Sequence, residues 1–172
     1  GLKRHMPMPH PSSILILGTD SSEISAVIKQ LETEPDLKLV DSHQFDFVLD
    51  HTELDYIDAV LILPKSETAL WKFLIENKFR GPLIGMGFGG EGVTEQIPVP
   101  VKANFLVHRI KAQIRNFQSR PETFLSIGSF KLYPALRLFV SPAGDELKLT
   151  DKEVDILRYL HRVGASEFDT CR

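Results

Sequence analysis

The residues that most resemble a chemical motif form a glycine-rich segment, GMGFGG, at Gly85–Gly90. Their spacing fits the G-x-G-x-x-G turn that binds dinucleotides, and they follow the apolar run Pro82-Leu83-Ile84. In such a turn a helix begins directly behind the glycines, so that its backbone N–H groups meet the pyrophosphate. An acidic residue about 20 positions later then binds the ribose.

The sequence around these glycines does not provide either feature. Only six residues separate Gly90 from the segment Ile97-Pro-Val-Pro100, which is too few for a crossover helix. No Asp or Glu occurs between Gln96 and Pro121. We therefore interpret the glycines as a loop that leads into a shortened helix, and we expect no nucleotide and no other cofactor.

Candidate metal ligands are scattered along the chain. The six histidines show no pair at helical spacing with a carboxylate partner in place, so we expect no metal site; they stand at 5, 10, 43, 51, 108 and 161. The one cysteine, Cys171, can form neither a disulfide nor a thiolate metal site within one chain.

Composition limits the classes of protein that remain. The 172 residues are 42% hydrophobic and 25% charged, with a net charge of -3, which is ordinary for one full domain plus part of another. No apolar run reaches the roughly 18 residues that span a bilayer, and the first residues lack the apolar core of a signal peptide. We expect a cytoplasmic protein with no membrane partner. The dipeptides His5-Met6 and Glu167-Phe168 read like cloning-site remnants, so residues 1–5 and about 165–172 are left out of the fold prediction.

Apolar runs alternate with helical patterns over residues 13–118, and this alternation predicts an α/β fold. The spacing predicts helices that begin after Asp20, cover 67–78 and carry Leu106, Ile110, Ile114 and Phe117 on one side, with a weaker helix at 43–53. Strands without polar alternation are typical of a parallel sheet covered on both faces. We therefore expect five parallel strands in a doubly wound arrangement, at 14–17, 37–40, 59–63, 82–86 and 97–101.

Two stretches carry a resemblance to a known family. The segment NFLVHRIKAQIRNF, at 104–117, resembles the last helix of a response-regulator receiver domain, and the order of the five units is similar to that flavodoxin/CheY-like fold. Residues 124–162 resemble the start of an OmpR/PhoB-type winged-helix domain, with short strands around Tyr133-Pro134 and Ala143-Gly144-Asp145. The family's Leu-Thr-x-Lys-Glu signature stands there as Leu149, Thr150, Asp151, Lys152 and Glu153.

The resemblance implies two domains. We expect a receiver-like domain at 13–118, a linker at 119–123, and the first strands and first helix of an incomplete winged-helix domain at 124–163. Thr150 and Glu153 also have the spacing of a capping box, which predicts a helix over 151–162 that buries Val154, Leu157 and Leu160.

A receiver domain is a phosphorylation switch whose chemistry needs particular residues. The resemblance implies two acids after the first strand for Mg²⁺, an aspartate after the third that accepts the phosphoryl group, a hydroxyl after the fourth and a lysine on the fifth. In this chain the corresponding positions hold Gly18 and Thr19, Leu63, Gly87 and Val99. None of these can accept or neutralise a phosphoryl group, so we expect no catalytic residue and no enzymatic activity.

Three nearby residues could substitute for the missing groups. Asp58 lies at the far end of the third strand, about five residues from the phosphoacceptor position. Lys102 is three positions late, which on a continuous strand would turn its side chain to the opposite face. Asp20 is better explained as a helix N-cap. We expect a pseudo-receiver that keeps the fold without the chemistry.

Receivers of the OmpR/PhoB type dimerise through the fourth helix, fifth strand and fifth helix, so the resemblance implies a homodimer. The segment from Lys102 to Arg120 is basic and contains no acid. The candidate dimer face consists of Lys102, Leu106, Arg109, Ile110 and Arg115. An ordinary solvated helix face remains the alternative for each charge taken singly.

DNA recognition by a winged helix requires a recognition helix and a wing, which would follow the helix of 151–162. Residues 124–172 contain seven basic and seven acidic residues, so no basic surface compensates. We expect promoter DNA to bind the native full-length protein but not this chain. Two functions stay open: a phosphorylation-independent transcription regulator, or a pseudo-receiver module that binds a protein partner or small ligand.

Overall fold

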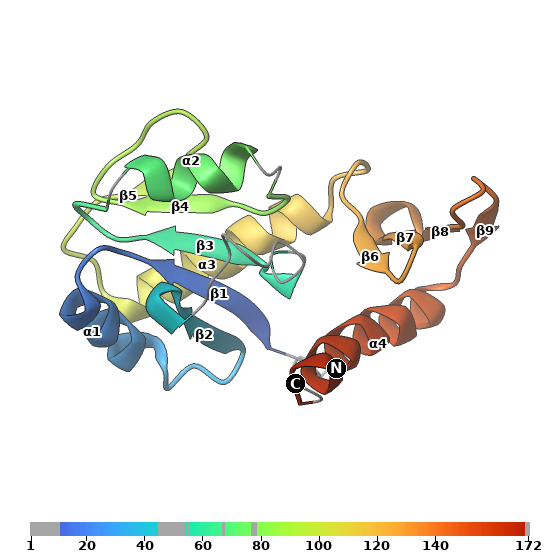
Figure 1. The fold of residues 1–172 in the computed structure, drawn as a ribbon, viewed down its shortest axis with the longest axis horizontal. Helices are drawn as coiled ribbons and strands as arrows, with labels where there is room; N and C mark the ends of the chain where they lie inside the picture. Colours follow the sequence, from blue (N-terminus) through green and yellow to red (C-terminus); the bar gives the residue numbers. More distant parts are fainter. Residues whose placement is uncertain (1–10, 45–53, 55, 67, 77–78, 171–172) are drawn as a thin grey trace, which may run out of the picture. The chain divides into compact units, whose positions relative to one another are not determined.

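Five parallel strands form the sheet of the first part of the chain, as seen in a computed structural model (Figure 1). The strands are β1 (Ser12–Leu17), β2 (Leu37–Asp41), β3 (Ala59–Ile62), β4 (Leu83–Met86) and β5 (Glu95–Ile97). The structure describes residues 11–44, 54, 56–66, 68–76 and 79–170. The chain divides into unit 1, which ends at Ile114, and unit 2, which begins at Arg115.

The strand order in unit 1 is β2-β1-β3-β4-β5, which is the order of the flavodoxin/CheY-like doubly wound fold. The predicted fold class is thus confirmed for this unit. Its helical segments are α1 (Ser21–Leu31), the short 3₁₀ helix η1 (Ser42–Gln44), α2 (Thr68–Glu76) and α3 (Ala103–Gln118).

Both faces of this sheet are buried, and neighbouring residues of each strand point to opposite faces. Ile14 and Ile16 of β1 pack with residues of α1 and α3, whereas Leu15 and Leu17 pack on the other side with Leu74 of α2. All four residues of β1 named here are fully buried. This two-sided burial explains why the central strands β1, β3 and β4 read as apolar runs, whereas the edge strands β2 and β5 are only partly buried.

The fifth strand is earlier and shorter than expected. The sequence predicts 97–101, but β5 covers Glu95–Ile97 and the chain leaves the sheet at Pro98. Proline has no N–H to donate to a ladder, so Pro98 and Pro100 exclude the following residues from regular pairing.

The fourth helix of the predicted arrangement does not form. The connection between β4 and β5, Gly87–Thr94, is described throughout and contains no helix. The expectation of a shortened helix after the glycines is therefore wrong. Eight residues, several of them glycines, are too few to build a helix and return to the sheet.

The boundary between the two units falls inside α3, a few residues before the expected end of the first domain. The segment predicted as a linker, 119–123, forms a turn bonded to the end of this helix. Ser119 N–H donates to the carbonyl of Arg115 at 3.0 Å, and Thr123 Oγ1 donates to the carbonyl of Phe117 at 2.7 Å.

Unit 2 consists of a four-stranded antiparallel sheet and one helix. The strands β6 (Leu125–Ile127), β7 (Phe130–Tyr133), β8 (Leu138–Val140) and β9 (Glu146–Lys148) are paired in sequence order, with the 3₁₀ helix η3 (Pro134–Leu136) between β7 and β8. Two residues join β6 to β7, and the first of them, Gly128, has a φ of 61°. A left-handed first residue suits the tight hairpin turns that match strand twist, and glycine adopts it without strain.

The helix of unit 2, α4 (Asp151–Thr170), begins at the predicted capping box. Glu153 Oε1 accepts from the Thr150 N–H at 2.8 Å, and Thr150 Oγ1 accepts from the Glu153 N–H at 3.2 Å, which confirms the reciprocal cap. The helix continues beyond the expected end near 163.

The predicted buried face of α4 is only partly correct. Val154 is buried and Leu157 half-buried, as expected, but Leu160 is 50% exposed. His161 is buried in its place. The residues that face inward follow the spacing 154, 157 and 161, whereas position 160 is turned toward the other side of the helix.

Some predictions concern residues outside the described part of the chain, namely most of the weak helix at 43–53, His5, His10, His51 and Cys171. In the described part of the chain no helix is long and apolar enough to cross a membrane. Within that same part, no group of three or more His, Cys, Asp or Glu side chains is arranged to hold a metal ion.

Candidate functional site

The carboxyl ends of the parallel strands form the edge at which this fold places ligands. Gly18, Leu63 and Gly87 directly follow β1, β3 and β4, and Val99 comes two residues after β5. The structure therefore brings the four predicted positions to one edge of the sheet. Thr19 is exposed beside Gly18.

Aliphatic side chains fill the space between the ends of β1 and β3. Leu63 is 1% exposed, and its N–H donates to the Leu17 carbonyl at 2.9 Å, so that it extends the parallel ladder by one residue. A Cβ added to Gly18 would lie 3.1 Å from Ile24 Cγ1 and 3.3 Å from Leu63 Cδ1. Aliphatic groups thus occupy the position at which carboxylates would hold a cation, and they offer it no ligand.

The second pair of positions lies between the ends of β4 and β5. A Cβ added to Gly87 would lie 3.1 Å from Val99 Cγ2, so these two residues are in direct contact. Gly87 has a φ of 84°, a conformation that L residues rarely adopt. Neither residue has a side chain that can donate to an oxyanion.

Asp20 is the carboxylate nearest to the end of β1, and it caps α1 as predicted. Its Oδ1 accepts from Ser22 N–H and from Ser22 Oγ, each at 2.8 Å. These hydrogen bonds, that of the Ser22 hydroxyl foremost, lower the pKa of Asp20 below its ordinary value. Since its charge is already engaged at the helix N-terminus, Asp20 acts as a structural cap.

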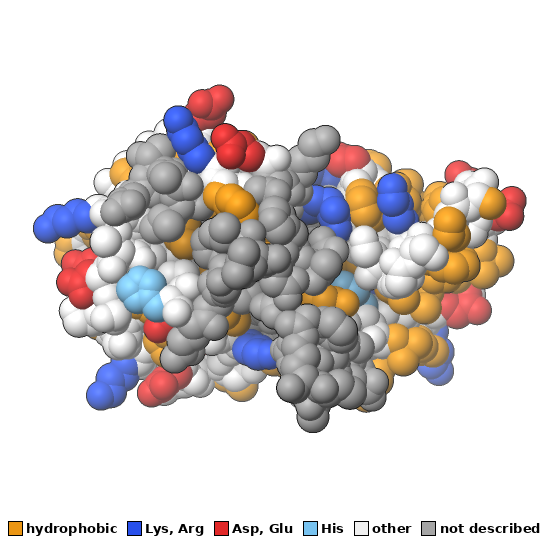
Figure 2. Space-filling model, in the orientation of Figure 1, with side chains coloured by type: hydrophobic (Ala, Val, Ile, Leu, Met, Phe, Trp, Pro, Cys, Tyr) orange, Lys and Arg blue, Asp and Glu red, His pale blue; other side chains and the backbone are white. Residues whose placement is uncertain are grey.

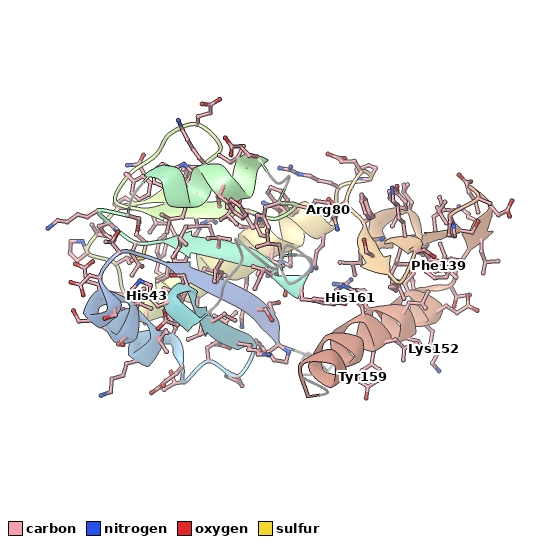
Figure 3. All side chains as sticks on the ribbon, in the orientation of Figure 1. His43, Arg80, Phe139, Lys152, Tyr159 and His161 are labelled. Carbon is pink, nitrogen blue, oxygen red and sulfur yellow. The ribbon has the colours of Figure 1, made fainter. Side chains whose placement is uncertain are left out.

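Two polar groups have a structural role at this edge that the sequence does not indicate. His43 of η1 lies at this end of the sheet (Figure 3), with Nε2 3.2 Å from the carbonyl oxygen of Gly18. Ser66 Oγ lies 2.6 Å from the carbonyl oxygen of Leu63 and 3.2 Å from that of Leu17. Both groups hold loop backbone in place. Their only signal in the sequence is their position three residues after Val40 and Leu63, where the apolar runs end.

Asp58 and Lys102, the other two residues that could substitute for the missing groups, lie away from the aliphatic side chains between β1 and β3. Asp58 precedes β3, at the opposite edge, where its Oδ2 accepts from the Ser13 N–H at 2.7 Å. Lys102 lies outside β5, so the alternation of side chains along a strand does not determine which way it points. It stands directly before α3, and its carbonyl accepts from the Leu106 N–H at 3.0 Å.

The candidate dimer face needs a correction. Leu106 and Ile110 are fully buried in the core of unit 1, so they cannot contribute to a contact surface. Their spacing marks the inward stripe of α3 and was assigned to the wrong side of the helix. With the fourth helix also missing, only Lys102, Arg109 and Arg115 remain of the predicted face, and Lys102 and Arg115 are exposed.

Arg109 is held within unit 1 by a carboxylate of β5. Its Nε and one terminal nitrogen each lie 2.7 Å from a Glu95 oxygen, and Gln113 donates to Glu95 at 2.6 Å. The hydrogen bond from Arg109 lowers the pKa of Glu95, and Glu95 in turn raises the pKa of Arg109. A bidentate pair of this kind fixes α3 on the edge strand.

Lys111 makes a similar connection beside β2, the outermost strand on the side of the sheet opposite to β5. Its ammonium group lies 3.0 Å from Glu34 and 2.8 Å from Asp36, in the turn between α1 and β2. Arg109 and Lys111, two basic residues of the segment from Lys102 to Arg120, therefore have acidic partners within the same unit.

The glycine segment does not have the geometry of a nucleotide-binding turn. Gly85 lies inside β4 and is buried, whereas the turn requires its glycines after the strand. The residues behind Gly90 continue as a loop, so they present no helix N-terminus to a pyrophosphate.

The signature of unit 2 lies at the start of α4. The Leu149 N–H donates to the carbonyl of Arg137 at 2.8 Å, and Arg137 pairs with Asp151 at 2.8 Å. Thr150 and Glu153 form the cap, and Lys152 is exposed. These residues order the junction between sheet and helix.

No protein-family model and no curated protein sequence matches this chain. Solved structures that resemble it are mainly receiver domains. A response regulator receiver domain from Clostridium thermocellum is 18% identical, with a TM-score of 0.49, and the match covers 61% of this chain and 95% of that one. The pseudo-receiver domain of the CikA protein is 14% identical, with a TM-score of 0.45, and covers 59% of this chain and 96% of that one.

A protein from Burkholderia pseudomallei described as pilus assembly-related is 14% identical, with a TM-score of 0.50, and covers 67% of this chain and 96% of its own. At these identities the likeness concerns the fold alone. Unit 1 has the CheY-like receiver fold, and the matches extend over the receiver portion of the chain.

Proposed function

We propose that the protein is an atypical response regulator of the OmpR/PhoB type that acts in the cytoplasm without phosphorylation. The observation that carries this proposal is the contact of Leu63 with Gly18 at the carboxyl edge of the sheet. Because aliphatic groups occupy the place of the phosphoacceptor and of the metal ligands, unit 1 can serve as a scaffold but not as a phosphorylation switch.

The proposed role of unit 1 is to join two copies of the chain. Without a phosphoryl group, the equilibrium between monomer and dimer depends on packing and on protein concentration. The surface available for this contact is β5 together with the outer side of α3, where Lys102 and Arg115 are exposed and Phe105 is 52% exposed.

The proposed role of unit 2 is to begin a winged-helix domain that binds promoter DNA when complete. Its antiparallel strands and the capped start of α4 support this assignment. Further support comes from the side of α4 turned away from Val154 and His161, where Ile156, Tyr159 and Leu160 are 51%, 46% and 50% exposed.

A helix that is apolar on two sides is normally covered on both. Figure 2 shows hydrophobic side chains gathered over unit 2, and Figure 3 shows Tyr159 and His161 leaving α4 on different sides. The further helices of a complete winged-helix domain would cover the outer side.

The alternative is a protein-interaction or ligand-sensing module without DNA binding. The exposure of Val99, at 45%, close to the former site is the observation that favours it, because an apolar side chain there is available to a partner. The filled space between Gly18 and Leu63 speaks against a small ligand at that point.

Capture of genomic DNA fragments separates the two functions. The native full-length protein is incubated with genomic fragments at physiological salt, with and without acetyl phosphate and Mg²⁺. We expect the same specific fragments in both conditions. Absence of specific fragments in both would support the interaction module, and capture only with the phosphodonor would contradict the interpretation of Leu63.

A further inference from the structure

The connection between β4 and β5 is unusual for parallel neighbours. Parallel strands need a crossover that normally takes a dozen or more residues and contains a helix. Here Gly87–Thr94 makes the crossover without one. We refer to these eight residues as the strap.

Both ends of the strap are fixed to the sheet by backbone hydrogen bonds. The Gly87 N–H donates to the Ile97 carbonyl at 2.7 Å. At the other end, the Thr94 N–H donates to the Leu83 carbonyl at 2.7 Å, and Thr94 Oγ1 accepts from the Leu83 N–H at 2.9 Å. The strap is thus bonded to the strands that it joins.

The middle of the strap packs onto β4 and α2. A Cβ added to Gly85 would lie 2.5 Å from the Phe88 carbonyl oxygen and 3.3 Å from Val93 Cγ1, so the strap passes directly over β4. The ring of Phe88 lies 5.2 Å from that of Trp71. The strap itself thereby covers the part of the sheet that a crossover helix would cover.

A glycine holds the strap against α2 at a second point. Gly92 has a φ of 84°, and a Cβ added there would collide with Ile75 Cδ1. Gly90, in contrast, has no atom near its Cβ position and no left-handed φ. Gly92 is therefore required chiefly by its left-handed φ, whereas nothing in the surroundings of position 90 requires glycine there.

We propose that the strap is a fixed element that holds the carboxyl edge of unit 1 in one conformation. The segment that resembles a nucleotide turn then serves to close the β4–β5 crossover, with its glycines allowing close packing. A fixed strap also leaves no moving lid over the former phosphorylation site. This inference is independent of whether the protein binds DNA.

Hydrogen exchange of the 172-residue chain tests the proposal directly. Amides of a fixed strap open with the sheet, so we expect protection of Gly87 and Thr94 within about tenfold of that in β3. Relaxation-dispersion NMR should show no exchange on the microsecond to millisecond timescale across the strap. Free exchange of both amides, or dispersion confined to the strap, would overturn the proposal.

Two glycine variants form a matched pair. Gly92→Ala places a side chain against Ile75 in a left-handed conformation, and we expect protection at Thr94 to fall by about tenfold or more. Gly90→Ala should leave it unchanged, since its Cβ meets nothing. Equal effects of the two substitutions would contradict a packed strap.

A third variant covers the case in which Gly92→Ala fails to fold. Trp71 is the only tryptophan of the chain, so its fluorescence reports the Phe88 contact. Phe88→Leu should increase acrylamide quenching of Trp71 and reduce protection at Gly87. Unchanged quenching and protection would show that Phe88 does not hold the strap.

Discussion

Substitution of Leu63 by aspartate tests the physical account of the degenerate site. The change restores the residue type that a receiver needs at this position, but it places a carboxyl group among Gly18, Ile24 and the rest of the core. We expect it to destabilise unit 1 and to give no phosphorylation, because the metal ligands and the lysine are still missing.

The size of the expected destabilisation follows from the burial of Leu63. Leu63 is 1% exposed, so loss of its packed side chain should cost about 2–5 kcal/mol, as for other large-to-small core substitutions. Burial of a carboxyl group also raises its pKa, by about 2, and each pKa unit adds about 1.4 kcal/mol to the cost at neutral pH. The sum of roughly 5–8 kcal/mol is comparable to the whole stability of a small domain.

Urea unfolding followed by the fluorescence of Trp71 measures this effect in unit 1 alone, because no other tryptophan is present. Leu63→Met conserves volume and should cost less than about 1.5 kcal/mol. Leu63→Ala should lower the urea midpoint by about 1–3 M, given a cost of about 2–5 kcal/mol and a slope of about 1.5–2 kcal/mol per M. Leu63→Asp should lower it further or unfold the unit.

The pH dependence of stability distinguishes the cost of the buried charge from the cost of the lost packing. A carboxyl group with a raised pKa in the folded state binds its proton more tightly there than in the unfolded chain. Leu63→Asp should therefore gain stability relative to Leu63→Asn as the pH falls from the folded pKa toward about 4, the unfolded value. A cost below about 1 kcal/mol for Leu63→Asp at neutral pH would refute the reasoning, since a buried, packed position cannot accept a charge so cheaply.

Two further predictions concern other described contacts. Arg109 lowers the folded-state pKa of Glu95, so the stability that this pair contributes is present above the unfolded pKa and is lost as the pH falls through the folded pKa. The free energy of unfolding of Glu95→Gln should therefore fall less on acidification than that of the wild type. Equal curves for the two proteins would mean that the pair contributes nothing. Thr150→Ala removes one half of the capping box, so it should lower the free energy of unfolding of unit 2 by about 1 kcal/mol and increase hydrogen exchange at the Glu153 N–H. The control Lys152→Ala, at an exposed neighbouring position, should change neither quantity.

The sequence predicts the central strands of the sheet well because they are buried on both faces. Runs such as Ile14–Leu17 have no polar alternation, and this pattern has few interpretations other than a covered parallel strand. The sequence predicts the helix N-caps equally well. Asp20 and Thr150 stand directly before apolar periodic segments, where a side-chain oxygen that accepts a backbone N–H is favoured over most alternatives.

The errors arise where two interpretations share one pattern. Leu106 and Ile110 repeat at helical spacing, which identifies a stripe on α3 but does not say whether the core or a partner covers it. The helix α4 carries apolar residues on two sides, so Leu160 and His161 could not be ranked from periodicity alone.

The region around β5 shows a different limit. The run Ile97–Val101 is apolar, yet Pro98 and Pro100 remove the donors that a strand needs, and the paired residues lie earlier, at polar Glu95 and Gln96. Glu95 is tolerated there because Arg109 and Gln113 bind its carboxylate. Such a long-range partner cannot be found from local sequence. The packing of Gly92 against Ile75 is hidden from the sequence for the same reason.

Intact mass spectrometry after incubation with acetyl phosphate and Mg²⁺ tests the central claim most directly. The wild-type chain should show no base-labile phosphoryl adduct, because Leu63 and its neighbours provide neither a nucleophile nor a metal ligand. A receiver domain with an intact aspartate serves as the positive control. A stoichiometric, base-labile adduct on the wild-type chain would contradict the account.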